Sequence, residues 1–359
     1  MNNKYYEIVL QGTDNQKTFS SFLFYNTFLP QLHNYFINKE TSEILINFDQ
    51  ISRISPLAVP LVLSAGIILR DYFKKPVEIY LPPYSKLLYY LNDIDFIDLA
   101  SGRIKNQNYE TPAIFTFPTL KKIFFSKERK LGDFCETIYV NRDLEEDEIF
   151  STYFYKYHEI LVKILNKNKK SSIYYIDEMI RRIILNIIQL CRNGIYHSDS
   201  SCFATIQLNK YNNFLCSVSD SGIGFYQSFL KKIKSGWNSL RFITREEFFE
   251  LKGVEKNIYA IFEAIFFRYD NSEHGLFDVF DYILSESVNG TIRVHSDNSR
   301  LVFTKNTYLK YFEKDKLSIE DIHKAIKYFL KQVGNDDSNV VTSSFRGVHI
   351  EFEIPLKRL

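Results

Sequence analysis

A stripe of polar side chains and a glycine-containing loop lie close together in the sequence and could bind a nucleotide. Four polar residues recur at the spacing that puts them on one face of a helix predicted over Ile173–His197: Asn186, Gln189, Asn193 and His197. Two predicted strands later comes Asp220-Ser221-Gly222-Ile223-Gly224. Polar side chains that cannot join a core face solvent or a ligand, and glycines let a backbone approach a ligand closely. The combination suits a nucleotide.

The residue types indicate how such a ligand would be held. Asn193 offers a neutral amide oxygen, which suits a Mg²⁺ ion already held by phosphates. The Asp220 carboxylate can accept a hydrogen bond from the amino group of adenine. Gly222 and Gly224 would let the backbone approach the base and the ribose. Gly275 precedes a predicted helix, whose first N–H groups and dipole favour phosphate.

Each of these signals has a plainer interpretation when it is taken alone. The sequence Asp-Ser-Gly-Ile-Gly also forms ordinary turns, and Asn193 could be a solvated helix residue. His197 either caps or packs at the end of its helix or contacts a phosphate. His274 is either a phosphate neighbour or a surface residue. The case for a nucleotide therefore rests on the joint spacing of Asn193 and the Asp220 loop, with a hairpin between them.

The apolar pattern predicts the elements that position these residues. Opposite the polar stripe, six apolar residues can face a sheet: Ile180, Ile184, Ile187, Ile188, Cys191 and Ile195. Phe203–Leu208 and Phe214–Val218 predict an antiparallel hairpin, and residues 226–266 are mostly helical in pattern, with interruptions at Ser235-Gly236 and Gly253. The segments beyond them are predicted as a helix over Leu276–Leu284, paired strands over Gly290–His295 and Leu301–Thr304, a helix over Ser318–Gln332, a polar loop over Gly334–Ser344 and a closing strand over Gly347–Ile354.

The first hundred residues alternate between strand and helix patterns. The predicted order is a strand over 4–10, a helix over Phe19–Phe36, a strand over Glu43–Asp49, a helix through Phe73, a strand over Val77–Leu81 and a helix over Ser85–Leu91. Ser55 before Pro56 is an N-cap and first-turn signal for the second helix. This alternation favours a small α/β sandwich with helices on one face. Residues 101–145 lose periodicity and are expected to be a connector with a strand over Glu136–Val140, before a helix over Asp147–Leu165.

Composition narrows the classes of function. The 359 residues include 45 basic and 43 acidic side chains, so no polyanion partner such as nucleic acid is indicated. The four cysteines have no Cys-x-x-Cys spacing, which favours free thiols in a reducing compartment. No cleavable leader opens the chain, and the apolar run Ile54–Leu69 is interrupted by prolines and is too short for a membrane span. We therefore expect a cytoplasmic protein with no membrane contact.

The polar stripe and the glycine loop resemble the GHKL (Bergerat-type) histidine-kinase-like ATPase fold. The resemblance spans residues 146–359, and it rests on Gln189-x-x-x-Asn193-x-x-x-His197 followed by Asp220-x-Gly222-x-Gly224. Gly290–Val294 and Arg346–Ile350 are similar to the last strands of the anti-sigma-factor serine kinase branch. The resemblance implies an α/β sandwich with a mixed sheet, a helical ATP lid over 226–274, and ATP and Mg²⁺ as ligands, with Asn193 on the metal.

Residues 1–100 resemble a STAS domain, the anti-anti-sigma-factor fold. The resemblance rests on the element order, the Ile-Ser-Pro turn and Asp95-Phe96-Ile97. Family members that are switched by phosphorylation carry a serine at the turn before the second helix. Here that turn reads Ser55-Pro56-Leu57-Ala58, and Leu57 occupies the acceptor position without a hydroxyl. The expected organisation is a two-domain α/β protein: a STAS-like domain over 1–100, a connector over 101–145 and a GHKL-type domain over 146–359.

One departure from the kinase branch matters for catalysis. That branch has a glutamate as general base four residues before the asparagine, where this chain has Gln189. A neutral amide cannot accept a proton. We therefore expect an ATP-binding signalling protein with little or no hydrolysis, whose nucleotide state controls a protein–protein interface. The alternative is a slow ATPase, or a serine/threonine kinase of the anti-sigma-factor type acting in trans.

Two further classes remain open. A histidine kinase would use His158-Glu159 as its phosphoacceptor, but His158 lies too close to Asn193 for a dimerisation hairpin, and no proline follows it. A structural scaffold with a decayed site would not need Asn193, Asp220 and both glycines. The expected protein partner is a STAS or sigma-factor-like regulator or the chain's own N-terminal domain, and a homodimer is possible.

Overall fold

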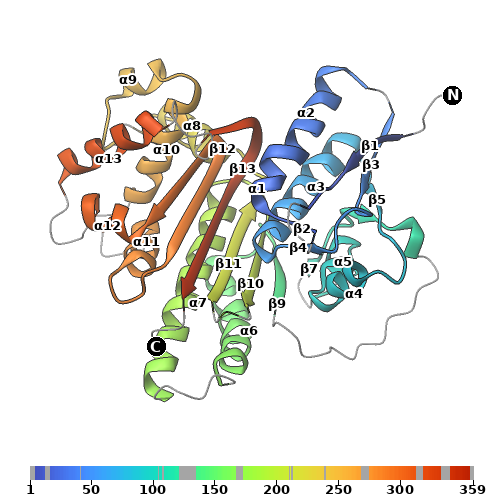
Figure 1. The fold of residues 1–359 in the computed structure, drawn as a ribbon. Coiled ribbons are helices and arrows are strands. Elements are labelled where there is room, and N and C mark those ends of the chain that lie inside the picture. Colours follow the sequence, from blue (N-terminus) through green and yellow to red (C-terminus); the bar gives the residue numbers. More distant parts are fainter. Residues whose placement is uncertain are drawn as a thin grey trace.

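Two sheets of different kinds organise the chain (Figure 1). The computed structural model describes residues 5–12, 17–40, 42–103, 105–106, 109–120, 135–166, 173–209, 211, 213–237, 240–267, 275–312, 318–332 and 340–355. The N-terminal sheet is parallel and the C-terminal sheet is antiparallel, so the protein is of the mixed α/β class that the sequence predicts.

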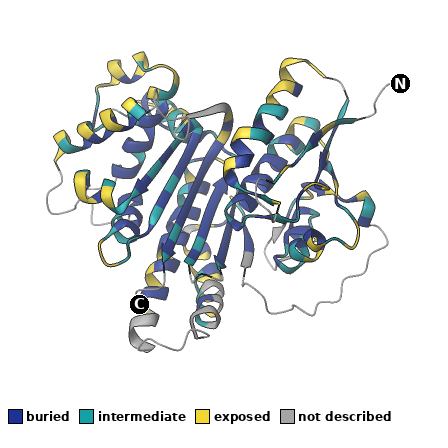
Figure 2. Ribbon diagram, viewed as in Figure 1, coloured by how far each residue is buried: buried dark blue, intermediate teal, exposed yellow. Residues whose placement is uncertain are grey.

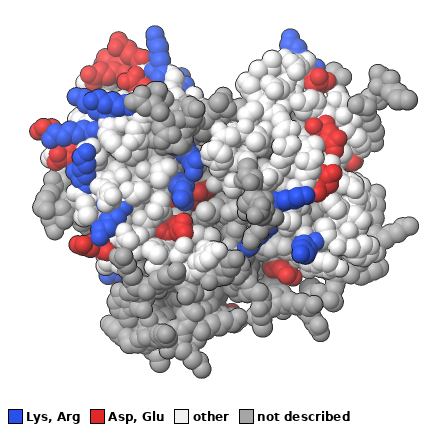
Figure 3. Space-filling model, in the orientation of Figure 1, with Lys and Arg blue, Asp and Glu red and all other residues white. Residues whose placement is uncertain are grey.

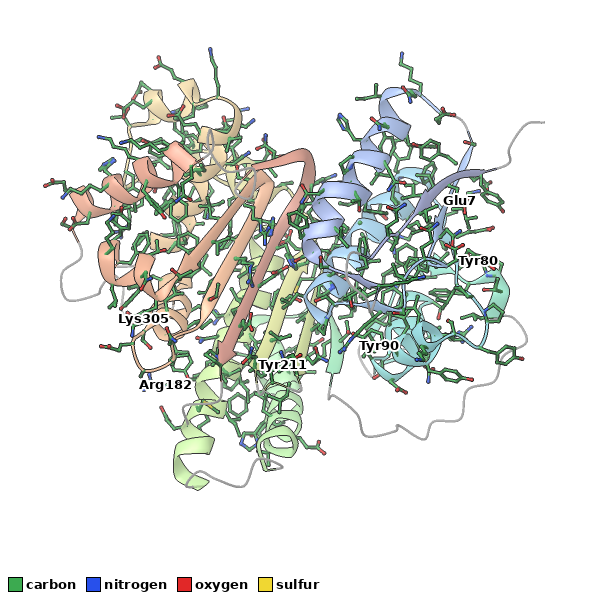
Figure 4. All side chains as sticks on the ribbon, viewed as in Figure 1. Glu7, Tyr80, Tyr90, Arg182, Tyr211 and Lys305 are labelled. Atoms are coloured by element: carbon green, nitrogen blue, oxygen red, sulfur yellow. The ribbon has the colours of Figure 1, made fainter. Side chains whose placement is uncertain are left out.

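The N-terminal sheet has four parallel strands in the order β1-β3-β5-β8: β1 (Tyr5–Val9), β3 (Glu43–Asn47), β5 (Val77–Tyr80) and β8 (Phe115–Thr116). At its edge the carboxylate of Glu7, labelled in Figure 4, accepts a hydrogen bond of 2.6 Å from the Asn47 side chain. Two short ladders pair β2 (Thr18–Phe19) with β4 (Arg53–Ile54), and β6 (Lys105–Asn106) with β7 (Tyr109–Glu110). The helices α4 (Lys86–Asp93) and α5 (Phe96–Ala100) follow β5.

The helix predicted over Phe19–Phe36 forms as three consecutive segments. These are α1 (Ser21–Leu23), the π-helical turn η1 (Phe24–Phe28) and α2 (Leu29–Ile37). Ser20 caps the start through its side chain, which accepts a hydrogen bond from the Leu23 N–H. Pro30 has no N–H to donate to the preceding turn, and the π turn lies immediately before it.

The second helix begins differently from its prediction. Residues Pro56–Ala58 form a 3₁₀ turn, η2, before α3 (Val59–Phe73), and the Ser55 side chain makes no capping hydrogen bond. Ser55 therefore occupies the predicted N-cap position, ahead of η2, but it does not cap through its side chain. Pro60 is accommodated in the first turn of α3, where its missing N–H is not needed. Among the described residues, Pro56–Phe73 is the one helical stretch long and apolar enough to span a membrane, and 67% of it is buried inside the protein.

The C-terminal sheet is antiparallel in the order β12-β13-β11-β10-β9. Its strands are β9 (Cys135–Val140), β10 (Cys202–Leu208), β11 (Asn213–Asp220), β12 (Thr291–Thr304) and β13 (Val340–Pro355). The helices that follow along the chain are α6 (Glu146–Asn166), α7 (Ile173–Tyr196), α8 (Gly224–Lys234), α9 (Arg245–Glu250), α10 (Gly253–Phe266), α11 (Leu276–Leu284), α12 (Lys305–Tyr311) and α13 (Ile319–Gln332). The hairpin and the helices over 173–197, 276–284 and 318–332 form as predicted.

Strand β12 corrects one prediction. The sequence predicts two paired strands over Gly290–His295 and Leu301–Thr304, but the structure has a single strand through both. The register against β13 shifts on either side of Asp297, whose φ of 56° is left-handed. The polar residues between the two apolar segments therefore form a bulge in a long strand, instead of the turn of a hairpin. β13 likewise begins at Val340, inside the predicted polar loop.

Helices α1, α2 and α3 lie between the two sheets (Figures 1 and 2). Side chains alternate along the C-terminal strands, so one face packs on α7, α10 and α11 while the other meets the N-terminal half. There the Ser64 hydroxyl of α3 donates to the Ser219 carbonyl at 3.2 Å, and the Ser217 hydroxyl donates to the Pro56 carbonyl at 3.3 Å. Phe203 of β10 joins the N-terminal core. Helix α3 is apolar on nearly all sides because it packs between two sheets.

The residues expected to be a connector contribute to both sheets. β8 lies inside 101–145 and pairs with β5 in the N-terminal sheet. β9 pairs with β10 and becomes an edge of the C-terminal sheet, where the sequence predicts a strand. Two strands of the connector are thus built into the two main sheets, while β6 and β7 pair only with each other.

Candidate functional site

Helix α7 presents the predicted polar stripe to a cavity. The six apolar residues predicted to face a sheet are all buried in the C-terminal core. On the other side, Gln189, Asn193 and His197 line the cavity. Asn186 lies one turn earlier and is buried, but it is not among the lining residues. The helical spacing therefore identified three residues that share a site.

The cavity has two lobes that meet at α7. The Asp220 lobe, of about 440 Å³, has mainly apolar walls, including Leu190, Val218, Leu276, Val348 and Ile350. The Lys232 lobe, of about 490 Å³, includes Gln189, Ser228, Phe229, Lys232, Phe267 and Gly275. The residues common to both are Asn193, His197, Phe225, Ser228 and Leu276. Together the lobes have the mixed lining, apolar walls with a few polar side chains, that is typical of a small-molecule site.

Asp220 places a buried carboxyl group at the apolar end. It is the last residue of β11 and is 3% exposed. Its Oδ1 accepts a hydrogen bond of 2.8 Å from the Gly222 N–H. Burial raises the pKa of Asp220 to about 7, although hydrogen bonds from the Gly222 and Val348 backbones and from Ser198 act to lower it. A carboxyl group in an apolar pocket that titrates near neutral pH is typical of a functional position.

The glycines of the loop have different roles from those predicted. A Cβ on Gly222 would lie 2.2 Å from the Ser198 Cβ, so Gly222 allows the loop to pack on the end of α7 and does not line the cavity. Gly224 does line the Asp220 lobe and has a φ of 74°. A third glycine, Gly347, has a φ of 113°, and a Cβ there would lie 2.2 Å from the Asp220 carbonyl oxygen. The expected approach to a base or ribose therefore concerns Gly224 alone.

The expected phosphate side of the site is only partly available. Gly275 lines the Lys232 lobe and is the N-cap of α11. Its own N–H donates to the Asp278 carboxylate at 3.1 Å and is therefore not free for phosphate. A side-chain oxygen three residues into a helix commonly satisfies this N–H. His274 lies outside the described residues.

The neighbouring helix α11 is held against α7 beyond the cavity. Arg182, labelled in Figure 4, lies on α7 about two turns before Gln189. Its guanidinium is 5.7 Å from the ring centroid of Tyr282 on α11, and it pairs with Glu178 at 2.8 Å.

Metal binding would depend on the ligand. Among the described residues, no group of three or more His, Cys, Asp or Glu side chains could hold a metal ion. Asn193 is partly exposed in both lobes and offers one amide oxygen. This single amide oxygen fits a Mg²⁺ ion that takes most of its ligands from phosphates and water. The described residues do not form a metal site of their own.

Lys232 and Phe267 are site residues that sequence analysis missed. Helix α8 carries Phe225, Ser228, Phe229 and Lys232 at helical spacing, and all four line the cavity. That spacing was a usable signal, but a stripe of this kind is also typical of ordinary core packing. Phe267 follows α10, which gives no hint in the sequence that it faces Lys232. Only the tertiary structure brings α8 and α10 together.

Comparisons with known proteins do not identify the chain. No protein family model, no curated protein and no solved structure matches it.

Proposed function

We propose that this chain is an ATP-binding regulatory protein built from a GHKL-type ATP-binding domain and an N-terminal STAS-like domain. The proposal rests mainly on one observation: a single cavity joins the buried Asp220 carboxyl group to the polar side chains of Asn193 and Lys232. Adenine suits the apolar Asp220 lobe, because its flat rings would be buried and its amino group would face a carboxylate. Phosphates suit the Lys232 lobe.

The proposed roles of the chain's own residues follow from their positions. The Asp220 carboxylate would accept a hydrogen bond from the adenine amino group. Asn193 would hold Mg²⁺ together with the phosphates. When bound, the ion neutralises phosphate charge and orients the phosphates. Phe225 and Leu276 line both lobes and exclude water between them.

Hydrolysis is expected to be slow. Gln189 is buried in the Lys232 lobe, where the related kinases have a glutamate, and the residues lining this lobe include no Asp or Glu. An amide can position a water molecule but cannot take its proton. His197 is the remaining lining side chain that could act as a base near neutral pH. We therefore favour nucleotide binding over efficient turnover.

The partner that fits the arrangement best is the chain's own N-terminal half. Val348 and Ile350 of β13 line the Asp220 lobe. His349 and Glu351, which alternate with them along the strand, are buried toward the N-terminal helices. One strand thus meets the nucleotide site on one face and the STAS-like half on the other. A nucleotide that favours one arrangement of β13 would shift how the N-terminal helices dock.

The surroundings of the site agree with a regulator in the cytoplasm. Cys191, Cys202 and Cys216 are free and buried. Basic and acidic side chains are interspersed on the face drawn in Figure 3, in keeping with the balanced composition. We therefore propose a protein ligand and a nucleotide, without nucleic acid or membrane. A STAS or sigma-factor-like regulator in trans, or a second copy of the chain, remains the alternative partner.

Titration calorimetry with Mg-ATP and Mg-ADP tests the proposal on the full chain. Asp220→Asn should weaken both complexes alike because adenine is common to them, whereas Asn193→Ala should weaken the Mg-ATP complex more. Asp199→Asn is the matched control: it removes the same charge from an exposed residue after α7 that does not line the cavity. No heat and no thermal stabilisation with millimolar nucleotide would rule out the proposed function.

A further inference from the structure

Lys232 stands out among the residues that line the cavity. Among the residues that the structure describes, it is the one Lys or Arg in the lining of either lobe. Its ammonium lies 4.3 Å from the ring centroid of Phe267 and 5.7 Å from that of Phe229. An ammonium over an aromatic face is attracted by the electrons of the ring, but this attraction is weak where water has access. Lys232 is half-buried, so its contact with Phe267 can be exchanged for a stronger one.

A nucleoside polyphosphate offers that stronger contact. Hydrogen bonds between an ammonium and an anionic oxygen are among the strongest that side chains make. The stem of lysine has four flexible carbons, so the ammonium can turn from the ring into the lobe without moving its helix. The other described polar side chains there are the amides of Gln189 and Asn193, the hydroxyl of Ser228 and the imidazole of His197, none of which carries a permanent positive charge. A di- or triphosphate would therefore find its cation in Lys232.

We propose that Lys232 binds the phosphates of the nucleotide by leaving the ring of Phe267, and so makes the site selective for nucleoside polyphosphates over nucleosides. The inference rests on the proposed function and adds its phosphate-sensing residue. Gly275 is a poorer candidate, because its N–H already donates to Asp278.

The aromatic partners of Lys232 connect it to the segment between α8 and α10. Phe267 also packs against Trp237, with ring centroids 5.5 Å apart, and Phe229 packs against Trp237 at 5.9 Å. The backbone N–H of Trp237 donates a hydrogen bond to the backbone carbonyl of Lys232 at 3.1 Å. Trp237 is the single tryptophan in the chain. Departure of the ammonium from Phe267 changes the surroundings of this indole, which makes its fluorescence a direct report on Lys232.

This cluster belongs to a small core of its own. Phe229, Ile233, Phe248 and Ala260 are buried together, and Trp237 and Phe267 pack against them. The core joins α8, α9 and α10 separately from the main C-terminal core. A phosphate that withdraws Lys232 therefore changes the packing of this small core first. The segment predicted to be the ATP lid is where such an adjustment would be felt.

The test compares Lys232→Met with Lys231→Met in the full chain, using calorimetry and tryptophan fluorescence with Mg-ATP, Mg-ADP and adenosine. Both substitutions remove a cation from the last turn of α8, but Lys231 is exposed and does not line the cavity. Lys232→Met should weaken Mg-ATP roughly 10- to 100-fold, the usual effect of losing a charge-assisted hydrogen bond. Adenosine affinity should stay within about twofold, and Lys231→Met should bind all three as the wild type does.

Fluorescence separates a binding role from a packing role. Mg-ATP should change the Trp237 emission of the wild type, adenosine should change it less, and Lys232→Met should remove the difference, with partial rescue by Lys232→Arg. Equal weakening of adenosine and Mg-ATP by Lys232→Met, or no weakening of either, would overturn the inference while leaving the nucleotide site in place. A wild type that binds neither ligand would overturn the inference and the proposed function together.

Discussion

The ring of Tyr25 in η1 lies flat on the imidazole of His295 in β12, with ring centroids 3.9 Å apart and planes 3° apart. Both rings are buried, so the stack joins the N-terminal helices to the C-terminal sheet. On the sheet side the polar groups continue, with His349 Nε2 at 2.9 Å from Glu351 Oε1. The two halves of the chain therefore meet through polar and aromatic groups that are closed off from water.

Substitutions at Tyr25 should separate the contribution of the ring to stability from that of the hydroxyl. The Tyr25 hydroxyl has no hydrogen-bond partner among the described residues. Tyr25→Phe should leave the free energy of unfolding within about 1 kcal/mol of the wild type or raise it, because it removes an unsatisfied buried group. Tyr25→Ala should lower it by about 3–5 kcal/mol, the usual effect of emptying a buried aromatic site. Urea unfolding measures both, and a greater loss for phenylalanine than for alanine would contradict the assignment.

Acidification should weaken the contact through His295. Burial, followed by the charges of Arg300, His349 and Arg293, lowers the pKa of His295 well below its ordinary value. Below about pH 6.5 the unfolded chain binds a proton at His295 that the folded chain does not. The free energy of unfolding therefore decreases as the pH is lowered, by up to about 1.4 kcal/mol per pH unit. His295→Phe keeps an aromatic ring beside Tyr25 and should remove this part of the pH dependence. The exposed His33→Gln serves as the control and should not.

The contribution of Asp220 to stability should depend on pH in the opposite direction from that of His295. Its folded pKa of about 7 lies above the ordinary value of 3.8. The folded chain therefore holds the proton more tightly, and this contribution, fully present below about pH 3.8, is lost as the pH rises through 7. Asp220→Asn should gain stability over the wild type across that range, by an amount on the order of 4 kcal/mol. Affinity for adenine nucleotide should rise with pH through about 7, because the carboxylate is the better acceptor. A flat pH profile of binding would contradict this role.

The turn before α3 should not receive phosphate from the chain's own site. Leu57 stands where the STAS regulators that this half resembles have a serine, and the turn packs on β11 by way of Pro56 and Ser217, on the face of the sheet opposite the cavity. Intact-mass analysis after incubation with Mg-ATP should show no phosphate on residues 50–60. Ser55 is the nearest hydroxyl, and its side chain is not used as a cap. A stoichiometric adduct on Ser55 would favour the kinase interpretation.

The local elements around the site could be predicted because each carries its own periodic signal. Helix α7 buries one apolar face, and the hairpin of β10 and β11 alternates along both strands. β12 could not be predicted in the same way, because the polar residues of a bulge resemble those of a turn. The role of Gly222 was also hidden, since its need for space comes from Ser198 on a different element.

The contact between the two halves could not be predicted, for a physical reason. Many of the strand residues that face the N-terminal helices are polar, although Phe203 joins the N-terminal core. Thr205, Ser217, Ser219, His349 and Glu351 are among these polar residues, and all five are buried. In sequence, alternation of apolar and polar residues indicates a sheet with one face in water. Only the tertiary structure shows that helices cover this polar face. Lys232 was missed because its partner, Phe267, comes from another helix.

A single substitution should introduce the missing general base. Gln189 lies one helical turn before Asn193 in the Lys232 lobe, and glutamate has nearly the same shape as glutamine. Gln189→Glu should therefore place a carboxylate where the kinases that this site resembles have theirs. General-base assistance contributes about 10²–10⁴-fold when the geometry is right, so phosphate release at saturating ATP should rise by up to that factor. The affinity for ATP should fall, because the new charge repels the phosphates.

Two features of the experiment make the result specific to position 189. Leu185→Glu adds the same carboxylate one turn earlier on α7, at a residue that is 39% exposed and does not line the cavity, and it should not change turnover. Burial raises the pKa of a carboxyl group, so the activity of Gln189→Glu should increase with pH as the new group ionises. If the wild type already hydrolyses ATP briskly and Gln189→Glu changes nothing, the base is another residue, with His197 the first to replace. The proposal of a binding switch would then give way to an ATPase.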